Sequence, residues 1–291
     1  MIFRINGEKL EIETDKRLIG DILSEIDERA EAMDAVILDL SMDGRQVDTS
    51  ELEQLLGKSA SEPGNMDMTV RPIPEIKAYS LGILSDLLEL AADISEKDKG
   101  ELKDDLCKAW QSFKSAYYGL YSAEEISFLD AFGEAVDKME AQMGTMAKKL
   151  KGFFKERLAE LTEPEASMMS AAKLFNTIKN DLSEVSLKIQ TGKDKEAMNT
   201  MVIAVELINK TVRILPSYLQ YLKTADKKEP VIDGLSAAEF YTSLNGVLKE
   251  LAGAFENKDG ILIGDLAEYE ISPRLESFFT ALAARGAKDG R

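Results

Sequence analysis

The sequence lacks histidine and contains very little cysteine, proline or aromatic residue. Among its 291 residues there is no His, one Cys and seven Pro, and Phe, Trp and Tyr together make up 7%. Without His, Ser-His-Asp and Cys-His catalysis and His-ligated zinc or iron are excluded. Cys107 alone forms neither an internal disulfide nor a cysteine metal cluster. We therefore predict no catalytic residue, no metal ligand and no cofactor.

Long apolar runs are also absent. No stretch reaches the roughly 18 to 20 apolar residues that a membrane-spanning helix needs, and the most apolar one, residues 201–208, is interrupted by Glu206. The first residues alternate in polarity, instead of forming the basic and then apolar regions of a secretory signal. An unpaired cysteine suits a reducing compartment. The expected location is the cytoplasm.

The charge is strongly acidic. The chain has 36 Lys and Arg against 53 Asp and Glu, a net charge of −17. This balance opposes phosphate backbones and anionic lipid, so we expect protein partners and neither nucleic acid nor membranes. A homo-oligomer is also possible. The acidity is concentrated near the start: residues 1–75 hold 18 acidic and eight basic residues, a net charge of −10.

The first 75 residues are rich in turn signals. Asn6-Gly7 and Asp43-Gly44 each separate alternating runs and predict β-hairpins. Between them, residues 17–32 have apolar positions at helical spacing, and a capping box at Ser50 predicts a short helix that stops at Gly57. Pro72 and Pro74 close the segment. The predicted core of this domain consists of Phe3, Ile5, Leu18, Ile22, Leu38 and Val70.

This order of strands, helix and turns resembles the β-grasp (ubiquitin-like) fold. The segments "MIFRINGEKLEIE" and "VILDLSMDGRQVD" are similar to the two hairpins of the small sulfur carriers of thiamine biosynthesis. The resemblance implies a β-grasp-like domain over residues 1–74. Sulfur carriers act through a free C-terminal Gly-Gly, whereas here the chain continues through Pro72 and Pro74. A docking or dimerisation surface is therefore expected, and a carrier role is not.

Residues 75–291 predict a larger, all-α bundle of antiparallel helices, which makes the fold class α+β. Capping boxes begin at Ser122, Thr162 and Ser236, and Pro216 should kink or break its helix. Two helical hairpins are expected at about 164–224 and 235–286, because their Lys-Asp turns superpose at an offset of 65 residues. They indicate either an internal duplication or convergent turn chemistry.

Two surfaces of the bundle are candidates for partner binding. Pro273 should bend the return helix of the second hairpin, and a bent helix closes poorly on its neighbours. The predicted groove there is lined by Tyr269, Pro273, Phe278 and Phe279. The second candidate is a basic cluster that includes Lys148, Lys149 and Lys151. It could receive an acidic partner, although a solvated helix face is the simpler interpretation.

These features favour a non-catalytic protein-interaction or scaffold protein. One alternative is a chaperone-like adaptor for secretion or motility clients, because residues 188–212 resemble the helical hairpin of flagellar export chaperones. A second alternative is a Mg²⁺-dependent enzyme that uses paired carboxylates. The candidate carboxylates for that role are Asp104, Asp105, Glu124, Glu125, Glu268 and Glu270.

The N-terminal signals together predict that residues 1–73 fold by themselves. A fragment with these residues should give a ¹⁵N-¹H NMR spectrum with the wide amide dispersion of a sheet, because both hairpins and the principal helix lie within it. The narrow dispersion of a random coil would show that the domain assignment is wrong.

Overall fold

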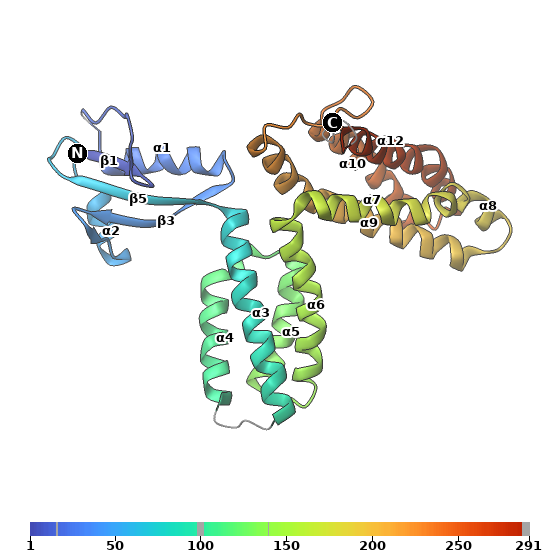
Figure 1. The fold of residues 1–291 in the computed structure, drawn as a ribbon, viewed down its shortest axis with the longest axis horizontal. Coiled ribbons are helices and arrows are strands. Elements are labelled where there is room, and N and C mark those ends of the chain that lie inside the picture. Colours follow the sequence, from blue (N-terminus) through green and yellow to red (C-terminus); the bar gives the residue numbers. More distant parts are fainter. Residues whose placement is uncertain (16, 98–101, 139, 287–291) are drawn as a thin grey trace. The chain divides into compact units, whose positions relative to one another are not determined.

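The structure of the protein is a computed structural model, and it describes residues 1–15, 17–97, 102–138 and 140–286. It has the expected α+β class, with a small N-terminal sheet followed by helices (Figure 1). The chain forms two compact units, Met1–Leu158 and Ala159–Arg291, and each is described separately. The predicted domain boundary at residue 74 lies inside the first unit and stays a prediction. No described helix is long and apolar enough to cross a membrane.

A five-stranded mixed sheet forms the first part of the chain, with the strand order β2-β1-β5-β3-β4. The central strand β5 is parallel to β1 and antiparallel to β3, and each outer pair is a hairpin. The elements are β1 (Ile2–Ile5), β2 (Glu8–Lys9), α1 (Ile19–Glu31), β3 (Ala35–Met42), β4 (Arg45–Gln46), α2 (Thr49–Leu56) and β5 (Asn65–Pro72).

Both predicted hairpin turns are confirmed. Asn6 and Gly7 have φ values of 52° and 86°, and Asp43 and Gly44 have 51° and 82°. Two successive positive φ angles make the tight turn whose twist matches antiparallel strands. Helix α2 begins at Thr49, one residue before the predicted cap, and ends at Leu56, next to Gly57 as expected.

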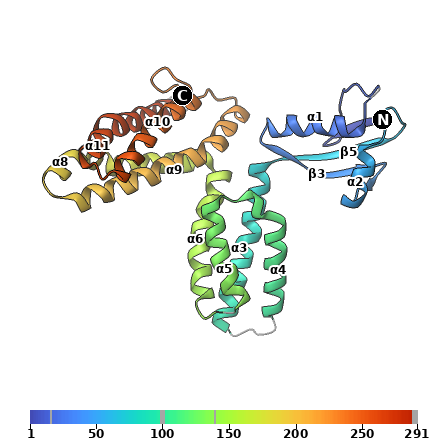
Figure 2. The same cartoon turned by 180° about the vertical axis from the view of Figure 1, so that it is seen from behind.

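Helix α1 runs beside β5 and β3 in both views (Figures 1 and 2) and buries one face against the sheet. Phe3 and Ile22 are buried as predicted, but Leu18 and Leu38 are 46% and 53% exposed. Leu18 precedes the first residue of α1, so Ile19 takes the buried position. Leu38 lies at a register shift between Ile37 and Asp39, where a β-bulge leaves one residue without a cross-strand partner.

The helices that complete the first unit lie side by side (Figures 1 and 2). They are α3 (Ile73–Lys97), α4 (Lys103–Tyr117), the short 3₁₀ segment η2 (Tyr118–Leu120), α5 (Ala123–Asp137) and α6 (Met143–Thr162), which ends in the second unit. Trp110 of α4 is buried, and its ring centroid lies 5.1 Å from that of Phe132 on α5. A Cβ at Gly133 would lie 2.6 Å from Nε1 of Trp110, so this close packing requires glycine.

The second unit consists of helices joined by turns and loops, the longest of which is the segment 225–236 between α9 and α10. Its elements are α7 (Pro164–Ser183), α8 (Val185–Gln190), α9 (Asp194–Thr224), α10 (Ala237–Glu256), α11 (Gly260–Asp265), the π-helical segment η3 (Leu266–Ile271) and α12 (Ser272–Gly286). The expected internal duplication stays a prediction. At the offset of 65 residues the two turns differ, because the positive φ lies at Gly192 in one and at Lys258 in the other.

Two of the three capping boxes are confirmed and one is wrong. The hydroxyls of Ser122 and Ser236 each accept a hydrogen bond from the backbone N–H of the glutamate three residues later. Thr162 instead ends α6, and α7 begins with Pro164 at its first position. Proline suits that position, because the N–H that it lacks would have no partner inside the helix.

The two prolines inside predicted helices have different outcomes. Helix α9 is not broken at Pro216, since it runs without interruption from Asp194 to Thr224. Pro273 lies in the first turn of α12, directly after the π-helical segment η3. The predicted return helix is therefore three segments, α11, η3 and α12, and its regular hydrogen bonding is interrupted next to Pro273 as expected.

Phe278 and Phe279 belong to the core of the second unit and do not line an open groove. They are 1% and 6% exposed. The Phe278 ring stacks on Phe240 of α10 with centroids 5.7 Å apart, and Phe279 stacks on Phe175 of α7 at 5.1 Å. The adjacent residues thus pack α12 against two different helices. The prediction that these two residues line a groove was wrong, because the interrupted helix still packs closely after Pro273. Partner binding at the exposed Tyr269 and Pro273 stays a prediction.

Truncation of Phe278 should therefore lower the stability of the second unit. The expected loss for Phe278→Ala is about 3 to 5 kcal/mol, the usual range when a buried Phe leaves a cavity. Urea-induced unfolding followed by circular dichroism measures it. The control is Tyr269→Ala, which should change stability by less than about 0.5 kcal/mol because Tyr269 is exposed. Equal losses in both variants would contradict the core assignment.

Candidate functional site

A groove opens on the N-terminal part of the first unit between α1, β3 and α2. Its volume is about 480 Å³. We call it the α1–β3 groove and define it by its lining residues Leu23, Asp27, Leu38, Leu40, Val47 and Leu52, with Asp39 and Asp48 at the same surface. All three elements contribute apolar residues to the lining.

One wall of the α1–β3 groove is a strand edge that is only partly covered. On the side away from β5, β4 pairs only with Ser41 and Met42, and the N–H of Val47 donates to the carbonyl of Leu40. Within the described residues, no strand pairs with 35–39 on that side. The edge opens because the chain leaves the sheet after Gln46 and starts α2 at Thr49.

The apolar lining of the groove includes one strongly exposed side chain, that of Leu38. Leu38 is 53% exposed, because the bulge turns this residue away from the ladder that joins β3 to β5. Leu23 on α1 is buried, and Leu52 and Leu56 on α2 are partly buried, so the groove continues into the core beneath. Exposed leucine next to an unpaired strand edge is typical of an interaction surface.

The rim of the groove is acidic. Asp27, Asp39 and Asp48 are among the lining residues, and no Lys or Arg is among the lining residues that the structure describes. The Asp39 carboxylate accepts a hydrogen bond of 2.7 Å from Nε2 of Gln46. The surface therefore combines an apolar floor with negative charge from α1, from β3 and from Asp48, which precedes α2.

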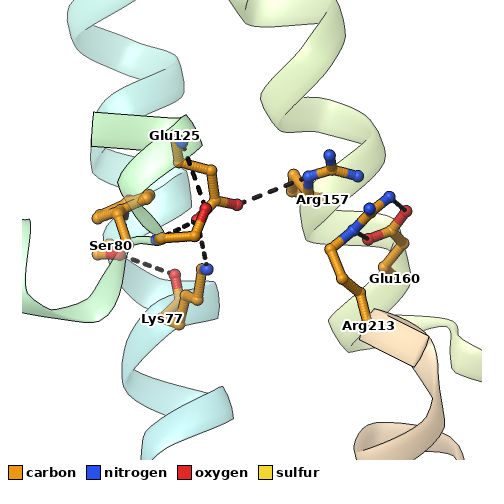
Figure 3. Close-up of polar contacts among 8 residues, drawn as sticks. Lys77, Ser80, Glu125, Arg157, Glu160 and Arg213 are labelled. Carbon is orange, nitrogen blue, oxygen red and sulfur yellow. Dashed lines mark hydrogen bonds and ion pairs between the residues drawn. The ribbon is translucent and has the colours of Figure 1, made fainter. Parts of the chain in front are cut away.

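A buried charge cluster lies elsewhere in the first unit, among α3, α5 and α6 (Figure 3). Glu125 is 2% exposed. Its Oε2 accepts hydrogen bonds of 2.8 Å from Nζ of Lys77 and from the backbone N–H of Ser122, and its Oε1 lies 3.6 Å from Nε of Arg157. One carboxylate thereby connects three helices.

Neighbouring groups complete this cluster. Burial favours the neutral acid of Glu125, but the hydrogen bonds from Lys77 and Ser122 and the charges of Lys77 and Arg157 outweigh it, so its pKa lies below the usual range. The Ser80 hydroxyl lies 2.9 Å from the hydroxyl of Tyr121. With two hydrogen bonds to Oε2 and the Arg157 charge near Oε1, the Glu125 carboxylate holds three helices together.

A second carboxylate that is paired with a basic side chain lies in the second unit. Glu160 accepts hydrogen bonds of 3.2 and 3.1 Å from Nε and Nη2 of Arg213, so that the guanidinium engages both oxygens (Figure 3). The two-point geometry is the strongest that this pair of groups offers. It connects the end of α6 to α9, and the sequence carried no motif that predicted it.

The residues predicted from the sequence are scattered. Lys148 and Lys149 are exposed on α6, and Lys151 on the same helix forms an ion pair of 3.0 Å with Glu89. Tyr269 and Pro273 are exposed, on η3 and α12. Of the candidate carboxylates, Asp104 and Asp105 lie in the first turn of α4 and Glu125 is in the buried cluster. The described residues contain no group of three or more Cys, Asp or Glu arranged to hold a metal ion.

Sequence reasoning missed the α1–β3 groove, although one signal for it was present. Only Arg45, Gln46 and Val47 separate the Asp43-Gly44 turn from Asp48 and the start of the next helix. A strand this short does not cover the eight residues of β3. The exposure of Leu38 had no such signal, because its alternating pattern predicted a core position.

Comparison with known families finds similarity to two uncharacterised domains. Residues 1–72 match the model described as the TP0873 N-terminal domain, which ends where β5 ends. Residues 166–281 match the model described as Domain of unknown function (DUF8042), which covers most of α7 to α12. No curated protein and no solved structure matches the chain. The groove and the helical second unit thus fall in two separate family regions.

Loss of the Glu125 charge should destabilise the first unit in a pH-dependent way. Glu125→Gln should cost about 3 kcal/mol at pH 7, as for a buried ion pair that loses one partner. The folded-state pKa of Glu125 lies below the unfolded value of about 4.3. Its contribution is therefore complete above that value, and it is lost as the pH falls through the folded-state pKa.

Chemical unfolding of both proteins between pH 3 and pH 7 checks this expectation. The control is Glu134→Gln, which removes the exposed partner of Lys138 on the same helix and should cost less than about 0.5 kcal/mol at any pH. A constant difference between the wild type and Glu125→Gln across the whole range would contradict the ionised state of Glu125.

Proposed function

We propose that this protein is a non-catalytic cytoplasmic interaction protein that binds another protein through the α1–β3 groove. The observation that carries the proposal is the open edge of β3 beside an apolar floor. A strand edge offers unpaired N–H and C=O groups to an incoming chain, and native proteins usually cover such edges. Here no described strand covers residues 35–39 on that side, and this range includes the exposed Leu38.

We also propose that residues 1–72 form a β-grasp domain. Support comes from the strand order β2-β1-β5-β3-β4, from the parallel pairing of β1 with β5, and from the helix that follows the first hairpin. A sulfur-carrier role forms no part of the proposal, because β5 leads directly into α3 at Ile73. In this proposal the sheet serves as a docking module.

A chaperone-like adaptor is the second candidate function, and it concerns the second unit. Helix α9 exposes Val202 and Val212, and α7, which packs against it, exposes Leu174. Apolar side chains on two neighbouring helices could receive the apolar face of a client helix.

Photo-crosslinking tests the proposed function. The full chain carries p-benzoylphenylalanine in place of Leu38, and the matched control carries it in place of Met33, which is also an exposed apolar residue but lies outside the groove. In native host lysate, irradiation should give discrete protein adducts from position 38 that are absent from position 33. Absent adducts, or the same adducts from both positions, would contradict the proposal. A third variant carries the crosslinker in place of the exposed Val202 on α9, and adducts from this position alone would favour the adaptor.

A further inference from the structure

We infer that the partner segment is extended, basic and apolar in alternation, and that it pairs with residues 36–39 as an additional strand of the sheet. The inference rests on the proposed function and names the chemistry of its partner. Three observations support it independently: the uncovered strand edge, the apolar floor and the acidic rim.

The backbone geometry favours an extended occupant over a helix. The available edge begins at Ala35 and ends where Leu40 accepts from Val47. With a rise of about 3.3 Å per residue, this edge accommodates about five residues of an added strand. An added strand satisfies its own N–H and C=O groups against β3, and such main-chain pairing supplies affinity whatever the side chains are.

The side-chain geometry gives the pattern of the segment. In a strand, alternate side chains point to opposite faces. Those that face α1 and α2 enter a floor formed by leucine and valine, including Leu23, Val47 and Leu52. β-branched residues fit both this floor and the extended backbone. The remaining side chains lie at the rim, beside Asp27 and Asp39.

The charges select a basic partner and disfavour a second copy of this chain. The rim presents Asp27, Asp39 and Asp48, and the groove has no lining cation among the described residues. Residues 1–75 carry a net charge of −10, so two copies of this domain would repel each other edge to edge. Lysine or arginine in the added strand would face opposite charge, which mainly speeds association and suppresses wrong partners.

The direct test uses a fluorescein-labelled octapeptide of alternating Lys and Val and the full-length protein. Fluorescence anisotropy should show saturable binding that weakens as salt rises, and hydrogen exchange should show new protection at residues 36–39. Two control peptides separate the contribution of charge from that of strand pairing. Alternating Glu and Val keeps the apolar pattern and reverses the charge, and N-methylation of alternate peptide bonds removes strand pairing and keeps the charge.

Variants of the protein test the same two contributions, the charge of the rim and the pairing with β3. Asp27→Lys should weaken binding roughly tenfold, about 1.4 kcal/mol, whereas Glu28→Lys makes the same charge change on an adjacent α1 residue outside the groove and should leave binding within twofold. Leu38→Asp should abolish protection at 36–39. Thermal unfolding of each variant establishes that it is folded, and both α1 positions are exposed.

Each outcome separates the inference from the proposed function. Equal binding of the N-methylated peptide would overturn strand addition, and equal binding of the Glu–Val peptide would overturn the basic partner. The protein could also form a dimer in the absence of peptide. If Leu38→Asp dissociates that dimer, a second copy of the chain occupies the groove in place of a basic partner. In any of these cases, crosslinked adducts between position 38 and other proteins would still support the proposed function. If such adducts were absent, the proposed function and this inference would both be contradicted.

Discussion

The surface on which the proposals depend exists because β4 is much shorter than the strand that it covers. A sheet edge is satisfied only where another strand lies beside it, and β4 contributes Arg45 and Gln46 against the eight residues of β3. The chain turns into α2 at Thr49, so the apolar residues of that helix stand across a gap from β3 and not in contact with it along its length. The groove is the space that results.

The bulge at Leu38 changes the character of that edge. Bulges and charged residues are common means by which proteins prevent edge-to-edge aggregation. In the proposal made above, Asp39 and the overall acidity of the domain would serve this purpose against another copy of the same domain. The same charges do not exclude a basic chain. Under the proposed function, protection against self-association and selection of a basic partner would both follow from the same acidic side chains.

The packing of α3, α5 and α6 depends on a different constraint, which is that a charge buried among them must be paired. Glu125 is nearly inaccessible, and it remains ionised because Lys77, Ser122 and Arg157 surround it. Removing any partner leaves a charge in a medium that solvates it poorly. Apolar packing brings α3, α5 and α6 together, and this carboxylate then fixes where they meet. Glu160 and Arg213 form a comparable pair in the second unit.

Sequence by itself determined the elements whose causes are local. The turns at Asn6-Gly7 and Asp43-Gly44, the cap at Ser122 and the apolar face that contains Ile22 depend on neighbours a few residues away, and all are present. Tertiary structure alone decided the exposure of the residues for which the local pattern was misleading. Periodicity placed Leu38 inside, and the bend expected at Pro273 left Phe278 open to a groove, but a bulge and the packing of α10 against α12 reversed both. The partners of Glu125 lie up to 48 residues away, and no pattern along the chain reports such distances, because they follow from how complete elements pack.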